Sequence, residues 1–123
     1  MPVLSNVIAF LATTDAARSR AFFETVLRLT LVPDDAFALV FDIGGTELRV
    51  QKVAAFTPQG FTALGWSVAD IDATLHDLAA RGVQALRFVG MEQDGLGIWT
   101  APGGARIAWF KDPDGNVLSL TAR

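Results

Sequence analysis

The chain contains no cysteine and only one histidine among its 123 residues. Without cysteine it has no disulfide framework, no thiol nucleophile and no thiolate metal site. None of its apolar stretches approaches the roughly 18 residues that a membrane-spanning helix needs. The first six residues carry no basic segment, so we expect no signal peptide, no membrane partner and a cytoplasmic protein.

Basic residues are few and scattered. Ten Lys and Arg stand against 13 Asp and Glu, which gives a formal net charge of −3, and no four basic residues cluster along the chain. Because nucleic-acid binding needs a basic surface that displaces counterions, we expect no nucleic-acid partner. Apolar residues make up 51% of the chain, which is enough for the core of one domain.

The end of the chain, residues 109–120, has the pattern of a β-hairpin. Pro113 presets φ for a turn, and the Asp, Gly and Asn residues around it favour turn geometry. The apolar residues on both sides form the two arms. A degenerate copy of this pattern occupies residues 41–50, which indicates one module used twice.

The order of predicted elements supports this duplication. Asp15 and Asp70 each follow a strand and cap a helix. Apolar periodicity and turn residues predict strands at 6–12, 30–32, 37–41 and 47–53 with a helix over 16–27, then a linker at 56–61. The second half repeats the order, with strands at 62–68, 85–89, 98–100, 107–110 and 117–121 and a helix over 71–81.

The double unit resembles the vicinal oxygen chelate superfamily, which includes glyoxalase I, extradiol dioxygenases, fosfomycin-resistance enzymes and bleomycin-resistance proteins. The strand ending at Asp15 and segments 21–27, 68–72 and 110–120 carry the resemblance. It implies an α+β fold, with two βαβββ modules forming a curled mixed sheet around a cavity and the helices on the outer face. We expect a single domain over 1–123, with module one at about 1–55 and module two at about 61–123, in a homodimer.

The metal enzymes of this superfamily place one ligand on each of four strands. Spacing from Asp15, Asp70 and the final turn, together with the internal repeat, assigns these positions to Ile8, Arg49, Ala63 and Ser119. None is a carboxylate or an imidazole, the donors that such ions need. We therefore expect no metal and no cofactor. The single histidine, His76, lies off the apolar stripe of its helix and is expected to point to solvent.

Alternation along the strands predicts which side chains face the cavity. Arg49 and Gln51 face it because the opposite register would bury them against a helix. The predicted ligand-binding residues lie on this face or on a Gly-rich segment at 90–104, and they are Ile8, Phe10, Arg49, Gln51, Ala63, Ser67, Trp99, Ser119 and Thr121.

Two of these residues leave alternatives open. Arg49 either clamps an anion through both arms of its guanidinium or pairs with Glu47 or another acid on the sheet. Trp99 either stacks on a ligand from a mobile flap or packs on the sheet in a hairpin connection. Trp109 is expected to pack rather than to recognise a ligand, and no catalytic residue is identified.

The sequence favours a metal-independent small-molecule binding protein of the glyoxalase or bleomycin-resistance type, with a small organic molecule as its partner. The first alternative is a lyase, isomerase or dioxygenase-like enzyme that uses atypical carboxylate ligands such as Glu47 or Glu92. The second is an assembly module whose dimer is its function. A group of acidic side chains converging in the cavity would favour the enzyme.

Overall fold

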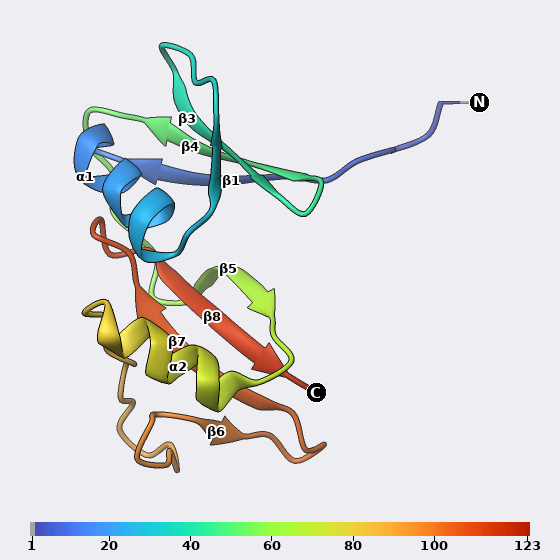
Figure 1. The fold of residues 1–123 in the computed structure, drawn as a ribbon, viewed down its shortest axis with the longest axis vertical. Helices are drawn as coiled ribbons and strands as arrows, with labels where there is room; N and C mark the ends of the chain where they lie inside the picture. Colours follow the sequence, from blue (N-terminus) through green and yellow to red (C-terminus); the bar gives the residue numbers. More distant parts are fainter. Residues whose placement is uncertain (1) are drawn as a thin grey trace. The chain divides into compact units, whose positions relative to one another are not determined.

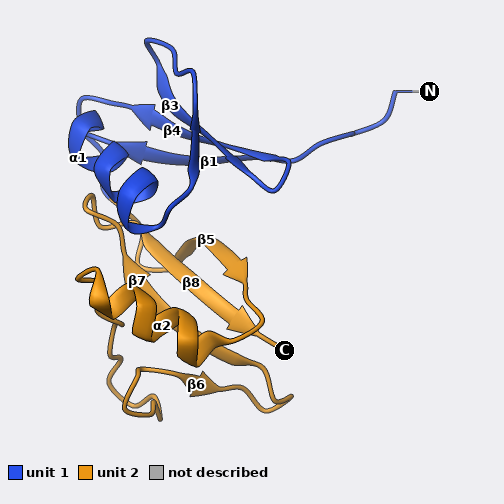
Figure 2. Ribbon diagram, viewed as in Figure 1, with its two compact units in different colours: residues 1–57 blue, residues 58–123 orange. Residues whose placement is uncertain are grey.

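The computed structural model describes residues 2–123. The chain divides into two compact units, 1–57 and 58–123 (Figure 2). The division falls inside the segment 56–61 that the sequence predicts as a linker. Each unit has its own sheet and its own helical segment (Figure 1).

Unit 1 is a βαβββ module with a four-stranded mixed sheet in the order β1-β4-β3-β2. β1 and β4 are parallel, and the other neighbours are antiparallel. The elements are β1 (Ile8–Thr13), α1 (Ala16–Arg20), η1 (Ala21–Val26), β2 (Thr30–Val32), β3 (Ala38–Ile43) and β4 (Thr46–Lys52).

Unit 2 repeats this topology with the order β5-β8-β7-β6. β5 and β8 are the parallel pair, as β1 and β4 are in unit 1. The elements are β5 (Thr62–Ser67), α2 (Ile71–Ala80), β6 (Trp99–Thr100), β7 (Arg106–Lys111) and β8 (Val117–Ala122). The predicted α+β class and the two βαβββ modules are confirmed.

The two helices begin at matching caps. The Asp15 carboxylate accepts a hydrogen bond from the Arg18 backbone N–H at 3.1 Å, and Asp70 accepts from the Ala73 N–H at 3.0 Å. Each cap satisfies a donor that the first helical turn leaves without a partner. After Arg20 the first helix widens into the π-helical turn η1.

Each helix covers one face of its own sheet, and the core of each unit lies between that helix and that sheet. In unit 1 Phe23 is fully buried and its ring centroid lies 5.7 Å from that of Phe41. In unit 2 the buried stripe of α2 contacts β8, and alternate residues of β7 and β8 are buried on the same side of the sheet. This stripe and these strand residues are Ile71, Leu75, Leu78, Ala108, Phe110, Leu118 and Leu120.

The final turn is built as the sequence predicts. Asp112 is 4% exposed, and its Oδ1 accepts from the backbone N–H groups of Asp114 and Asn116 at 3.0 and 2.9 Å. Its Oδ2 accepts from the Asn116 side-chain amide at 2.8 Å. These contacts assign Asp112 and Asn116 to the turn.

The predicted strand at 85–89 is wrong. The Leu86 N–H donates to the Trp109 carbonyl at 2.7 Å, but the segment forms no ladder. The Gln93 side chain takes the place of a strand partner: its amide nitrogen donates to the Leu86 carbonyl, and its oxygen accepts from the Phe88 N–H, both at 2.8 Å. Sequence periodicity does not reveal pairing with a side chain.

No helix in residues 2–123 combines the length and the apolar character that crossing a bilayer requires.

Candidate functional site

The face of the first sheet that is turned away from α1 and η1, here called the first open face, carries four of the predicted site residues. The register pairs Phe10 with Arg49, and Gln51 follows Arg49 by two positions. Ile8 precedes Phe10 by two positions on β1. Ile8 and Phe10 are 48% and 52% exposed, whereas Leu48 and Val50 on the other face are fully buried. The predicted orientation of β4 is confirmed.

Arg49 is paired with two carboxylates on this face. Its Nη2 lies 2.8 Å from Asp35 Oδ2, and its Nη1 lies 3.5 Å from Glu47 Oε2. The hydrogen bond from Arg49, helped by the backbone N–H of Phe37, lowers the pKa of Asp35 to about 2. The hydrogen bond from Asp35 raises the pKa of Arg49 in turn. An anionic ligand at Arg49 would have to compete with both acids.

The corresponding face of the second sheet, here called the second open face, carries Ser67, Ser119 and Thr121. The register pairs Gly65 with Ser119 and Ser67 with Thr121. A Cβ on Gly65 would lie 2.4 Å from the Ser119 hydroxyl, so the absence of a side chain at 65 makes room for Ser119. Ala63 falls at a shift in the β5–β8 register and has no β8 partner there.

A row of three aromatic rings, Phe88, Trp109 and Trp99, belongs to the second open face. Trp109 pairs with Ser119 and therefore shares its face. Its ring centroid lies 5.5 Å from that of Phe88 in an edge-to-face arrangement and 6.3 Å from that of Trp99. Its indole N–H donates to the Thr62 hydroxyl at 3.0 Å. We call these three residues the aromatic row.

The sequence predicts only packing for Trp109, but it also holds a signal for the place of this residue on the second open face. Ala108 and Phe110 are buried toward α2, so alternation alone turns Trp109 to the opposite face. A strongly apolar strand hides this alternation because every residue in it could belong to the core.

The Gly-rich segment 90–104 is tied down by side-chain hydrogen bonds. Asp94 Oδ1 accepts from the backbone N–H groups of Leu96 and Ile98, both at 2.9 Å. Gln93 donates to the Gly97 carbonyl at 2.8 Å. Trp99 begins β6, opposite Ile107 of β7, so it lies on the second open face as part of the sheet. Glu92 is exposed.

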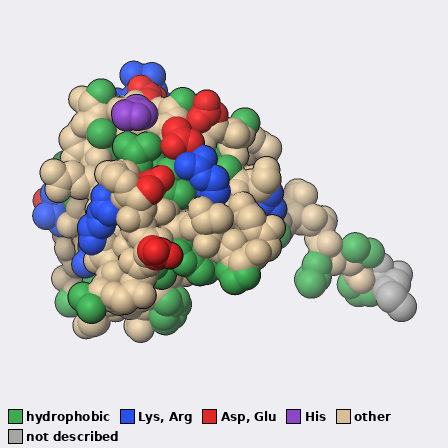
Figure 3. Space-filling view, turned by 90° about the horizontal axis from the view of Figure 1, so that it is seen from below, with side chains coloured by type: hydrophobic (Ala, Val, Ile, Leu, Met, Phe, Trp, Pro, Cys, Tyr) green, Lys and Arg blue, Asp and Glu red, His purple; other side chains and the backbone are tan. Residues whose placement is uncertain are grey.

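His76 is exposed on α2, as predicted, while Ile71, Leu75 and Leu78 are buried. Figure 3 shows the single histidine at the surface, with acidic and basic side chains interspersed around it. His76 takes no part in either open face.

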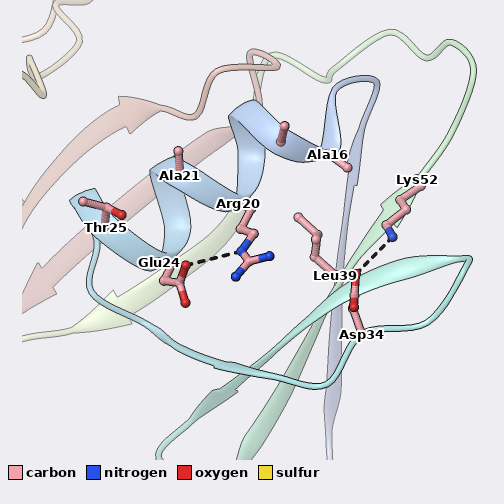
Figure 4. Close-up of a pocket in the computed structure, with 9 residues that line it drawn as sticks. Ala16, Arg20, Ala21, Glu24, Thr25, Asp34, Leu39 and Lys52 are labelled. Atoms are coloured by element: carbon pink, nitrogen blue, oxygen red, sulfur yellow. Dashed lines mark hydrogen bonds and ion pairs between the residues drawn. The ribbon is translucent and has the colours of Figure 1, made fainter.

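A cavity of about 410 Å³ lies in unit 1 beside α1 and η1, and we call it the Lys52 cavity (Figure 4). Its two cations are both paired: Arg20 Nε lies 3.3 Å from Glu24 Oε1, and Lys52 Nζ lies 3.1 Å from Asp34 Oδ2. Leu39 and several alanines supply its apolar lining. The cavity therefore presents compensated charge to a ligand.

The two βαβββ modules define the fold of the glyoxalase, bleomycin-resistance and dioxygenase superfamily, the vicinal oxygen chelate proteins. Residues 8–121 match the model of the glyoxalase-like domain, and the chain belongs to this family. No curated protein matches the sequence.

Several solved structures are similar over nearly the whole chain. A superfamily member from Sphaerobacter thermophilus is 22% identical with a TM-score of 0.76, and the match covers 98% of each chain. A lactoylglutathione lyase from Agrobacterium tumefaciens is 15% identical with a TM-score of 0.74, covering 98% of this chain and 95% of its own. The fosfomycin resistance protein FosX from Listeria monocytogenes is 16% identical with a TM-score of 0.72, covering 100% and 94%. At these identities the likeness shows the fold alone.

The side chains at the four positions that the resemblance assigns to the superfamily's metal ligands do not fit a divalent ion. Ile8 and Ala63 offer only hydrocarbon, and Arg49 offers a cation. Ser119 offers one hydroxyl, and this residue is only 8% exposed. Hard divalent ions need several oxygen or nitrogen donors, with carboxylates among them. Over the described range 2–123, no three or more His, Asp or Glu side chains gather so that they could hold an ion. Glu47 and Glu92 are the two carboxylates named for the enzyme alternative. Glu47 is paired with Arg49 in unit 1, and Glu92 is an exposed residue of unit 2.

Proposed function

We propose that this chain is a metal-independent small-molecule binding protein that holds an organic ligand against the open faces of its sheets. The observation that carries the proposal is the aromatic row, which places three rings beside the small polar residues of the second open face. Ligand sites combine apolar and aromatic walls with a few polar groups that fix orientation.

The small residues of this face support the proposal. Ser67 and Thr121 are paired on this face and carry hydroxyl groups, and Gly65 makes room for the Ser119 side chain beside them. Trp109 has a fixed orientation because its N–H is bonded to Thr62. A rigid aromatic surface loses little conformational entropy when a flat ligand stacks on it.

The enzyme alternative would require acids or bases that converge on the ligand. Glu47 is engaged by Arg49, and no described residue pairs with Glu92 in a way that would orient it for proton transfer. The binding function needs no such group, so we retain it as the proposal.

The proposal is tested by a thermal-shift screen of small organic molecules, run on the purified protein with and without EDTA, together with elemental analysis. A ligand at 100 times its Kd stabilises the folded state by about 2.7 kcal/mol. We expect hits that raise Tm equally in both conditions and raise it less in Trp109→Ala. A stoichiometric metal whose removal abolishes every hit would overturn the metal-independent function.

We also propose that the protein acts as a homodimer, as its superfamily resemblance implies. Light scattering on the native protein should then give twice the chain mass of 13.1 kDa. A monomer at micromolar concentration would contradict the dimer without affecting the ligand proposal.

A further inference from the structure

A second cavity, of about 360 Å³, lies at one end of the second open face. Lys111, the last residue of β7, and Val117, the first of β8, are register partners and both line it. Phe88 also lines it and joins it to the aromatic row through its edge contact with Trp109. We call this space the Lys111 cavity.

The Lys111 cavity is lined by cations without acids. Lys111 and Arg87 line it, and none of the described residues that line it is acidic. Lys111 forms no ion pair within residues 2–123. The two terminal nitrogens of Arg87 donate to the carbonyls of Asp94 and Gly95, at 2.6 and 2.9 Å, and these acceptors are neutral.

The nearest acid along the chain does not form an ion pair with Lys111. Asp112 follows Lys111 directly, and both of its carboxylate oxygens accept from neutral donors within its own turn. In a chain of net charge −3, the described lining of the Lys111 cavity thus carries two cations and no acid. Such a site attracts anions.

The wall formed by residues 58–60 is held close to the final turn. Gly115 adopts a φ of +91°, and a Cβ there would lie 3.1 Å from Pro58 Cγ. Only glycine allows both this backbone conformation and this approach without strain. The apolar wall at Pro58 is thus set by the same turn that places Lys111 and Val117.

We propose that the Lys111 cavity binds the anionic group of a ligand, a carboxylate, phosphate or sulfonate, whose planar apolar body lies on the Trp109 ring with its edge toward Phe88, which is nearly perpendicular to Trp109. The inference rests on the proposed function and names the chemical class of its ligand. The ammonium of lysine is a flexible point charge that suits each of these anions. The rings supply contact area for a flat body.

The test uses two dyes that share a ring system. 8-Anilinonaphthalene-1-sulfonate carries a sulfonate, and N-phenyl-1-naphthylamine is the same molecule without it. We expect Lys111→Gln to weaken the sulfonate dye about tenfold, the effect of losing one hydrogen bond to a charged group, and to leave the neutral dye unchanged. Lys111→Arg should retain the sulfonate dye, and raising the salt concentration should weaken only that dye.

The other lysine of the chain supplies the matched control. Lys52 is already paired with Asp34, so Lys52→Gln should leave the affinity for both dyes unchanged. Thermal unfolding of each variant checks that the fold is intact.

Two outcomes separate this inference from the proposed function. If Lys111→Gln binds both dyes as the native protein does while Trp109→Ala weakens both, the anion site is wrong and the ligand-binding face stands. If Trp109→Ala also binds both dyes with native affinity, the second open face is not the ligand site and both proposals fail.

Discussion

The two sheets of this protein share a topology but present different chemistry on their open faces. On the first open face Arg49 is paired with Asp35 and Glu47, and the apolar Ile8 and Phe10 lie exposed beside it. On the second open face the aromatic row lies beside small polar residues, with Lys111 unpaired at one end among residues 2–123. The βαβββ module therefore fixes where a face lies and leaves its chemistry to the individual side chains.

The Lys52 cavity of unit 1 and the Lys111 cavity of unit 2 differ in whether their lysine is paired. Both hold a lysine in a space of similar volume, about 410 and 360 Å³. Lys52 has a carboxylate partner in its cavity, and Lys111 has none in the described chain. Because a compensated charge gains little from a new counterion, the volume of a cavity does not by itself indicate an anion site.

The largest difference that we predict between the modules concerns their hairpin turns. Asp112→Ala leaves buried donors in its turn without partners and should lower the free energy of unfolding by about 2–3 kcal/mol. Asp42 accepts one exposed hydrogen bond, from Gly45 at 2.9 Å, so Asp42→Ala should cost less than about 1 kcal/mol. Urea denaturation measures both. Equal losses in the free energy of unfolding would mean that the two turns contribute alike and would contradict this prediction.

The next prediction compares the two open faces as binding surfaces. Trp109→Ala removes the middle of the aromatic row and should weaken N-phenyl-1-naphthylamine about tenfold. Phe10→Ala, its counterpart on the first open face, should leave the affinity unchanged. Fluorescence titration measures both affinities. If Phe10→Ala has the larger effect, the ligand lies on the first open face.

The smallest effect is expected at Arg49 and depends on pH. The pKa of Asp35 is lowered to about 2 from 3.8, so its ionised form favours the folded state. This contribution is present above about pH 4 and is lost as the pH falls toward 2. Arg49→Gln removes the main cause of the lowered Asp35 pKa. The free energy of unfolding should therefore decline less between about pH 4 and pH 2 in this variant.

Arg28, which is exposed and has no ion pair within residues 2–123, supplies the control for Arg49. Urea denaturation at pH 4 and at pH 2.5 should show the native decline in Arg28→Gln and a weaker one in Arg49→Gln. An unchanged decline in Arg49→Gln would mean that Asp35 does not depend on Arg49.

Much of the fold could be predicted from the sequence because its signals are local. Asp15 and Asp70 mark helix starts by bonding to N–H groups three residues ahead, and Asp112 and Asn116 close a turn within five residues. Alternation placed Arg49 and Ser119 on their faces, because burying Arg49 against a helix would leave its charge without compensation. The prediction of a strand at 85–89 is wrong because backbone groups of this segment form hydrogen bonds with the side chain of Gln93, and the segment forms no ladder with a neighbouring strand.

The sequence by itself determined the duplicated module and the two faces of each sheet, since these depend on residue type and short spacing. Only the tertiary structure decided which charges are compensated. Arg49 meets Asp35 across 14 positions of the chain, whereas Lys111 meets no acid within residues 2–123. It also brought Phe88, Trp99 and Trp109 into one row. The physical reason is that ion pairs and ring contacts act over a few ångströms, and folding, not proximity in the sequence, sets those distances.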